Sequence, residues 1–131
     1  MPAQSQIYVA VIDDDASVCR GMARLLRESG IHAITYPSAG EFLLDRKRPS
    51  FDCLLLDVEM AELSGLDLQE RLVNSGGRIP TIFITASDAP GMRERAERLG
   101  CGAYLRKTAS GNDLLRTIRS LIGKGKDTEH E

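Results

Sequence analysis

The sequence predicts an α/β protein in which a parallel β-sheet is covered by helices on both faces. Short apolar runs of strand length alternate with amphipathic stretches of helical periodicity, and this alternation occurs five times along the 131 residues. Glycine, proline and polar residues separate the elements. Because right-handed crossovers between parallel strands place helices on each side of a sheet, the alternation indicates a sheet with helices on both faces. The length fits a single domain.

Each predicted element has its own signal in the sequence. The five predicted strands are the apolar runs at 7–12, 31–36, 51–57, 79–85 and 103–105. The five predicted helices carry apolar residues at helical spacing within 18–29, 38–44, 66–73, 89–99 and 110–122. Gly30 ends the first helix, Ser38 with Glu41 resembles a capping box for the second, and Ser110 begins the last.

The predicted helix at 89–99 differs from the others in its narrow apolar face. Met92, Ala96 and Leu99 form this face, and charged residues surround it. A helix in water gains most of its stability by packing an apolar face against other elements. We therefore expect this helix to be the least firmly held element.

Composition and charge exclude several classes of protein. Lys and Arg number 17 against 19 Asp and Glu, and the net charge of −2 argues against direct binding of nucleic acid by this chain. Cys19, Cys53 and Cys101 are odd in number and widely spaced, so neither a disulfide framework nor a zinc site is expected. This pattern favours a reduced chain.

The first residues and the apolar runs predict neither a signal peptide nor a membrane-spanning segment. The first residues lack the basic start and apolar core of a signal peptide, and the apolar runs are too short to cross a membrane. We therefore expect a cytoplasmic protein without membrane contact. Residues 1–5 are expected to be disordered, 6–123 to form the domain, and 124–131 to be a charged tail or the start of a linker.

Acidic residues follow two of the predicted strands. Asp57 ends the apolar run at 51–57, and Asp13 and Asp14 follow the run at 7–12. Doubly wound sheets bind ligands beyond the carboxyl ends of their strands, so these carboxylates should lie close together. Carboxylates that crowd one another raise each other's pKa unless a cation neutralises them, and a divalent metal with oxygen ligands is the simplest solution.

Two further polar residues lie at the same predicted edge. Thr85 ends the fourth strand and Lys107 follows the fifth. A bound Mg²⁺, a hydroxyl and an ammonium group together could neutralise the oxygens of a phosphoryl group. The set therefore predicts phosphoryl transfer onto a carboxylate.

Over about residues 6–122 the chain resembles the receiver domain of bacterial two-component response regulators. The matching motifs occur in the order and spacing of that family: Val11-Ile12-Asp13-Asp14-Asp15, Leu54-Leu55-Leu56-Asp57-Val58-Glu59-Met60 followed by Gly65, Phe83-Ile84-Thr85-Ala86-Ser87, and Tyr104-Leu105-Arg106-Lys107. Each motif is weak alone, and together they are specific. The resemblance implies a flavodoxin-like, doubly wound, five-stranded parallel sheet with strand order 2-1-3-4-5.

The resemblance also implies a function. Asp57 would accept a phosphoryl group from the phosphohistidine of a sensor histidine kinase, in a protein that assists its own phosphorylation and dephosphorylation rather than acting as a conventional enzyme. Mg²⁺, or Mn²⁺, would be held by Asp13, Asp14, Asp57 and the main-chain carbonyl of Glu59. Thr85 would move toward the phosphoryl oxygens, and Tyr104 would follow it inward.

Other roles follow from the same resemblance. Glu59 and Ser87 would flank the water that approaches the aspartyl phosphate and so tune its lifetime. The third acid, Asp15, is expected to cap the first helix rather than bind metal. The face formed by the fourth helix, fifth strand and fifth helix would transmit the switch, in many receivers to a second copy. An output domain that regulates transcription could follow the charged tail.

Two positions depart from the family pattern. Ala61 replaces the usual proline after Met60, which leaves the loop after Asp57 less constrained. Thr108 follows Lys107, where receivers usually have a cis Lys-Pro bond; a cis bond before a non-proline residue costs roughly 3–4 kcal/mol. The loop must absorb that strain or be trans. Our hypothesis is that Lys107 still directs its ammonium group at Asp57.

Two alternative functions remain open from sequence. Asp13-Asp14-Asp15-Ala16-Ser17 also fits the DxDx[ST] signature of haloacid-dehalogenase-type phosphatases, but that reading leaves Asp57 unexplained and the chain has little room for a cap domain. A degenerate receiver that acts only as a binding module is favoured by Ala61 and Thr108. Mg²⁺-dependent phosphorylation at Asp57 distinguishes the three.

Overall fold

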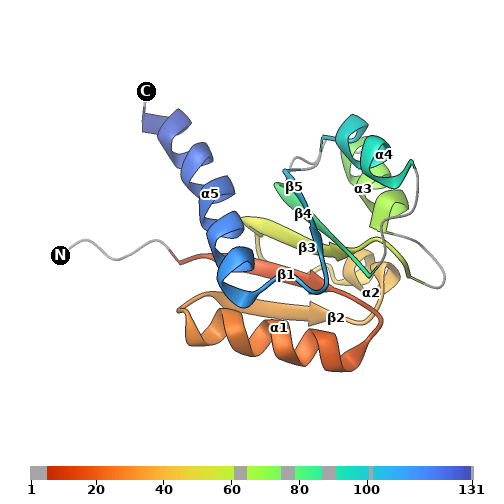
Figure 1. Cartoon of the computed structure of the whole chain (residues 1–131), viewed down its shortest axis with the longest axis horizontal. Helices are drawn as coiled ribbons and strands as arrows, with labels where there is room; N and C mark the ends of the chain where they lie inside the picture. Colours follow the sequence, from red (N-terminus) through yellow and green to blue (C-terminus); the bar gives the residue numbers. More distant parts are fainter. Residues whose placement is uncertain (1–5, 61–64, 75–78, 87–90, 101, 131) are drawn as a thin grey trace.

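The computed structural model describes residues 6–60, 65–74, 79–86, 91–100 and 102–130. Five strands form one parallel sheet in the order β2-β1-β3-β4-β5, as predicted (Figure 1). The strands are β1 Tyr8–Ile12, β2 His32–Tyr36, β3 Cys53–Asp57, β4 Thr81–Thr85 and β5 Ala103–Arg106. The helices are α1 Ala16–Glu28, α2 Ala39–Leu44, α3 Gly65–Asn74, α4 Met92–Arg98 and α5 Gly111–His130.

Helices cover both faces of this sheet because the central strands are apolar on both sides. Along β1, Val9 and Val11 pack in a cluster with α1 and α5, whereas Ala10 and Ile12 pack in a second cluster with α2, α3 and α4. Side chains of a strand alternate between the two faces, so one strand contributes to both clusters. Every residue of β3 and β4 is buried. The alternation of apolar runs and helices was therefore a sufficient signal for the layered fold.

The predicted helix caps are present. The backbone N–H of Glu41 donates to Ser38 Oγ at 3.1 Å at the start of α2, and the N–H of Asp113 donates to Ser110 Oγ at 3.1 Å at the start of α5. Each bond satisfies a backbone donor that has no partner within the helix. Gly30 has a φ of 82° just after α1, a conformation that favours glycine.

Helix α4 packs against the second apolar cluster. Its Ala96 is fully buried and Leu99, at its C-terminal end, is partly buried. An ion pair of 3.0 Å between Arg95 and Asp67 connects α4 to α3, and half-exposed pairs of this kind contribute little. The expectation that α4 is the least firmly held element stays a prediction.

Helix α5 is longer than the sequence predicted. Its backbone remains helical to His130, although residues 124–131 were expected to form a charged tail or linker. The apolar face ends at Ile122, which removes packing but leaves the backbone hydrogen bonds of the helix intact. Loss of periodicity therefore marked the end of the packed part of α5 and not the end of the helix, whose last turns extend past the sheet (Figure 1).

Within the part of the chain that the structure describes, no helix is both long enough and apolar enough to cross a membrane.

The start of α3 packs against the strand end that carries Asp57. A Cβ atom on Gly65 would lie 2.3 Å from the backbone oxygen of Asp57 and 3.1 Å from its carbonyl carbon, distances that exclude any side chain without backbone movement. The N–H of Gly65 donates to the carbonyl of Val58 at 3.3 Å. Gly65 thus allows α3 to begin directly beside the loop after β3.

We predict opposite effects for two glycine-to-alanine substitutions in helices. Gly21→Ala in α1 should raise the free energy of unfolding by about 0.5–1 kcal/mol, because alanine favours helix and its Cβ would meet no atom within 4 Å. Gly65→Ala should lower it by about 2 kcal/mol or more, since the backbone of Asp57 must shift. Urea denaturation measures both. A stabilised Gly65→Ala variant would contradict the close contact.

Candidate functional site

The polar residues predicted at the carboxyl edge of the sheet lie together. In the parallel register, Ile12 of β1 is beside Leu56 of β3, and Asp57 is beside Ile84 of β4. Consequently the residue after β1, Asp13, and the last residues of β3 and β4, Asp57 and Thr85, reach the same edge. All three are buried. The parallel register therefore brings three buried polar side chains together at the carboxyl edge of the sheet.

Three carboxylates form a cluster at this edge. Oxygen atoms of Asp13, Asp14 and Asp57 all lie within 4.8 Å of one another. Asp13 and Asp57 are buried, whereas Asp14 is exposed. The pKa of Asp57 is raised to about 6, because burial and the charge of Asp13 outweigh the backbone hydrogen bond from Glu59 and the charge of Lys107. Hard oxygen ligands with one side open to water fit Mg²⁺ or Mn²⁺.

Lys107 is placed between two of these carboxylates. Its Nζ lies 3.2 Å from Asp13 Oδ2 and 3.4 Å from Asp57 Oδ2. Burial lowers the pKa of this ammonium group, but the hydrogen bond to Asp13 and the charges of Asp57 and Asp13 outweigh that effect, so the net pKa is raised. Lys107 is thus a cation that partly neutralises the cluster.

The loop that carries Lys107 has an ordinary backbone. The Lys107–Thr108 peptide bond is trans, since the described residues contain no cis peptide bond. The N–H of Lys107 donates to the carbonyl of Thr85 at 2.7 Å and so extends the pairing of β5 with β4. The hypothesis that Lys107 directs its ammonium group at Asp57 without a cis bond agrees with this geometry.

Thr85 connects the cluster to the loop after β3. Its Oγ1 donates a hydrogen bond of 3.3 Å to Glu59 Oε1, and the backbone N–H of Glu59 donates to Asp57 Oδ1 at 3.1 Å. The two residues of this pair lie 26 positions apart in the chain. Roles for both Thr85 and Glu59 were predicted from the sequence, but the hydrogen bond between them was not.

Tyr104 lies on the same sheet face as Thr85, toward α4. It is paired with Phe83, which is two residues before Thr85 on β4 and therefore shares its face. The ring is partly buried against the α2–α4 cluster, and the guanidinium carbon of Arg93 in α4 lies 5.0 Å from the ring centroid. A change at Thr85 could thus reach α4 through Tyr104.

Asp15 has the role that was expected of it. It is the N-cap of α1, and its Oδ1 accepts hydrogen bonds from the N–H groups of Ser17 at 2.9 Å and Val18 at 3.4 Å. Its own N–H donates to Asp13 Oδ1 at 2.9 Å. Asp15 therefore serves the helix and orients Asp13. Two other positions named from sequence, Ser87 and Ala61, lie outside the described residues.

A hollow of about 330 Å³ adjoins the carboxylates on the α1 side. The sequence did not indicate that residues of α1 would line it. Arg20 and Cys19 of α1 line it together with Asp13 and Asp14. Cys19 Sγ donates to the carbonyl of Asp13 at 3.2 Å, and burial raises the pKa of this thiol, so it packs as a small residue. Arg20 gave no signal because arginines recur along the polar face of α1.

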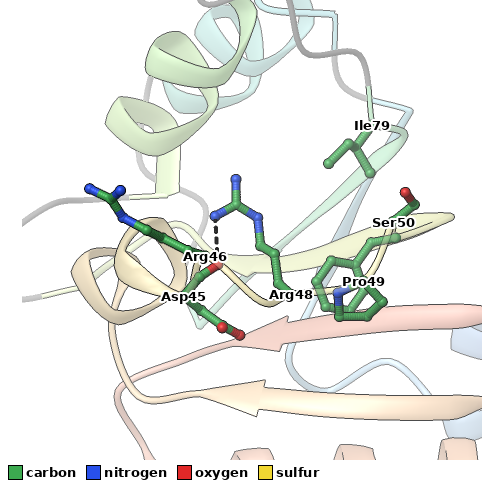
Figure 2. Close-up of a pocket in the computed structure, with 7 residues that line it drawn as sticks. Asp45, Arg46, Arg48, Pro49, Ser50 and Ile79 are labelled. Carbon is green, nitrogen blue, oxygen red and sulfur yellow. Dashed lines mark hydrogen bonds between the residues drawn. The ribbon is translucent and has the colours of Figure 1, made fainter.

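A second hollow, of about 650 Å³, lies beside the loop after α2 and is lined by Asp45, Arg46, Arg48, Pro49, Ser50, Phe51 and Ile79 (Figure 2). Its basic residues suggest an anion site, but Arg48 has a structural role. The guanidinium group donates to the carbonyls of Phe42 at 2.9 Å and Asp45 at 3.3 Å, at the C-terminal end of α2, and lies 4.4 Å from the Phe42 ring centroid. Arg48 thus caps α2.

Removing the charge of Asp57 should stabilise the metal-free protein. The carboxylate is ionised at neutral pH despite a pKa raised from 3.8 to about 6, so Asp57→Asn should raise the free energy of unfolding by at most about 3 kcal/mol at pH about 7.5. The gap should shrink as the pH falls from about 6 to about 4, because wild-type Asp57 then takes up a proton in the folded state. Glu70→Gln, at an exposed glutamate, is the control. Urea titrations across this pH range measure the gap; a gap that does not change with pH contradicts the assignment.

Adjacent aspartates should separate metal binding from helix capping. Asp14→Asn should weaken Mg²⁺ binding by at least about tenfold with little change in stability, since it removes a ligand candidate that is exposed. Asp15→Ala should lower the free energy of unfolding by about 1 kcal/mol and leave Mg²⁺ affinity nearly unchanged. Calorimetric titration with Mg²⁺ and urea denaturation test the pair. Loss of Mg²⁺ binding in Asp15→Ala would make Asp15 a ligand.

Comparison with curated proteins finds regulators of bacterial signalling. The chain is 36% identical over 119 residues to the response regulator protein TmoT of Ectopseudomonas mendocina, a match that covers 91% of this chain and 53% of TmoT. It is also 36% identical over 118 residues to the response regulator protein TodT of Pseudomonas putida, covering 90% of this chain and 51% of TodT. The chain thus spans about half the length of these relatives.

Solved structures and family models agree with these relatives. A response regulator receiver protein from Burkholderia phymatum is 45% identical, with a TM-score of 0.79, and the match covers 90% of this chain and 96% of that one. The family model for the response regulator receiver domain matches residues 9–119, a range that includes the carboxylate cluster, Thr85 and Lys107. The chain therefore belongs to the response regulator receiver domain family.

Proposed function

We propose that this receiver domain accepts a phosphoryl group on the carboxylate of Asp57 from the phosphohistidine of a sensor histidine kinase. One observation carries the proposal: the buried Asp57 carboxylate lies within 4.8 Å of the carboxylates of Asp13 and Asp14 and 3.4 Å from the ammonium group of Lys107. In the transfer, the P–N bond to the kinase histidine breaks as a P–O bond to Asp57 forms. Positioning and charge neutralisation are then the main tasks of the protein.

Asp13, Asp14 and Asp57 would hold a Mg²⁺ or Mn²⁺ ion, with the carbonyl of Glu59 as a further ligand. The ion, when bound, neutralises charge on the carboxylates and on the phosphoryl oxygens. The chemistry of the donor set supports this assignment, because hard oxygen atoms from three acids suit these ions. Asp14, the exposed member, leaves one side of the site accessible to water and to the phosphoryl donor.

Lys107 and Thr85 would contact the phosphoryl oxygens. The ammonium group of Lys107 already lies beside Asp57, so it can pair with a dianion there without a large movement. The hydroxyl of Thr85 would move to donate to a phosphoryl oxygen, and Tyr104 on the same sheet face would follow. Glu59 and Ser87, close in sequence to Asp57 and Thr85, would tune the lifetime of the phosphoryl group.

The face formed by α4, β5 and α5 would transmit the switch. Phosphorylation shifts an existing equilibrium in proportion to how differently the two states contact the phosphoryl group. The place of Tyr104 between the sheet and Arg93 of α4 supports this route. A second copy of this chain is the proposed partner on that face, which makes a homodimer the proposed active form.

The surrounding system is also a proposal. A curated relative from Thauera aromatica, 32% identical over 119 residues, is named transcriptional regulatory protein TdiR, and this chain covers 52% of it. By analogy, we propose that a separate output domain contacts DNA, while this chain binds neither nucleic acid nor membrane. Cys19 and Cys53 are free and buried, which fits a reduced compartment such as the cytoplasm.

The phosphatase alternative has less support. Its signature requires roles in catalysis for the acids at Asp13 and Asp15, but Asp15 is the N-cap of α1 and donates its N–H to Asp13. The alternative also assigns nothing to Asp57, the buried acid of the cluster.

Phosphorylation by a small donor tests the proposed function. With acetyl phosphate and Mg²⁺, the wild-type protein should gain one phosphoryl group by intact mass, and the label should map to Asp57. Asp57→Asn should remain unlabelled because an amide cannot accept the group. Chelation of Mg²⁺ should slow labelling by at least about tenfold. Lys107→Ala should still be labelled, but phosphorylation should change its α4 region less than that of the wild-type protein.

Three outcomes would contradict this prediction. Labelling that persists in Asp57→Asn would move the acceptor elsewhere. Failure of the wild-type protein to be labelled, by acetyl phosphate or by a histidine kinase, would favour a binding module that does not use phosphorylation. Turnover of phosphate esters that is lost in Asp13→Asn and kept in Asp57→Asn would favour the phosphatase.

A further inference from the structure

The hydrogen bond between Thr85 and Glu59 occupies the hydroxyl that the proposed function needs. Thr85 Oγ1 donates to Glu59 Oε1 at 3.3 Å, and Thr85 is fully buried at the end of β4. A threonine hydroxyl has one proton to donate. The proton that reaches Glu59 in this structure is therefore not available, at the same time, to a phosphoryl oxygen on Asp57.

The backbone of Glu59 also holds this residue at the site. Its N–H donates to Asp57 Oδ1 at 3.1 Å, which keeps the residue beside the acceptor carboxylate. The residue is exposed, so its carboxylate can turn toward water without being buried elsewhere. Repulsion between this carboxylate and a phosphoryl dianion on Asp57 would favour that movement. The bond is consequently one that phosphorylation can break.

We propose that Glu59 is a positioning residue whose carboxylate holds the Thr85 hydroxyl in its resting orientation and competes with the phosphoryl group for it. The inference rests on the proposed function and deepens it: Glu59 acts on the switch through Thr85, in addition to any effect on the attacking water. Removing the acceptor at Glu59 lowers the free-energy cost of turning the Thr85 hydroxyl toward Asp57. A phosphoryl group on Asp57, or a mimic of it, is then stabilised.

Affinity for beryllofluoride, a mimic of the phosphoryl group that binds carboxylates, tests this competition. In the presence of Mg²⁺, Glu59→Met removes both the acceptor and the charge, whereas Glu59→Gln removes the charge and keeps an acceptor oxygen. Glu59→Met should therefore bind beryllofluoride about threefold to tenfold more tightly than Glu59→Gln. Glu28→Met, which removes an exposed glutamate paired with Arg24 on α1, is the control and should match the wild-type protein.

The same comparison in a Thr85→Val background isolates the hydrogen bond. Valine has the shape of threonine without the hydroxyl, so Glu59→Met and Glu59→Gln should then have equal affinities. Equal affinities in the Thr85 background, or an unchanged difference in the Val background, would overturn the proposal and leave only a general charge effect of Glu59.

A second measurement does not depend on phosphorylation. Three-bond couplings in NMR spectra report the χ1 rotamers of Thr85 in the resting, metal-free protein. One rotamer should dominate in the wild-type protein and in Glu59→Gln, and several should be populated in Glu59→Met. A single unchanged rotamer in Glu59→Met would overturn the proposal. If the wild-type protein binds no beryllofluoride, the proposed function fails, and the couplings still decide whether Glu59 positions Thr85.

Discussion

Crowding of buried carboxylates at one end of the sheet is the constraint on which the rest of the structure depends. Asp13 and Asp57 are buried side by side because the parallel register of β1 and β3 brings their ends together. Burial and, next to it, the like charge of Asp13 make the ionised form of Asp57 costly, and this cost appears as the raised pKa of Asp57. The fold places a cation, Lys107, between the two carboxylates. The proposed Mg²⁺ or Mn²⁺ ion would neutralise the remaining negative charge.

The residues around Asp57 pack closely against it. Gly65 lets α3 begin against the carbonyl of Asp57, where any side chain would collide. The N–H of Glu59 donates to Asp57 Oδ1. Contacts of this kind hold a side chain in one orientation, so the proposed phosphoryl transfer to Asp57 would need less reorganisation. The cost of the site is offset by the two apolar clusters that pack around it.

Thr85 links this charge cluster to the surface proposed to transmit the switch. In this structure its hydroxyl faces Glu59, and Tyr104, on the same sheet face, lies beneath Arg93 of α4. Helix α4 packs on the sheet through the buried Ala96. In the proposed switch, a change of one hydrogen bond at Thr85 would reach α4 through Tyr104.

The sequence by itself determined the alternation of strands and helices, the apolar faces of the core and the acids that meet at Asp57, because these follow from the spacing of apolar residues and from where each run stops. The strand order came from the resemblance to the receiver family. The sequence also indicated the capping role of Asp15. The tertiary structure decided the features that join distant residues: the hydrogen bond from Thr85 to Glu59, the position of Lys107 between Asp13 and Asp57 on a trans backbone, and the contact of Gly65 with Asp57. It also decided that α5 stays helical to His130 after its apolar face ends. Periodicity reports which face of an element is buried, whereas side-chain pairing between elements depends on register and distance, which no local pattern contains.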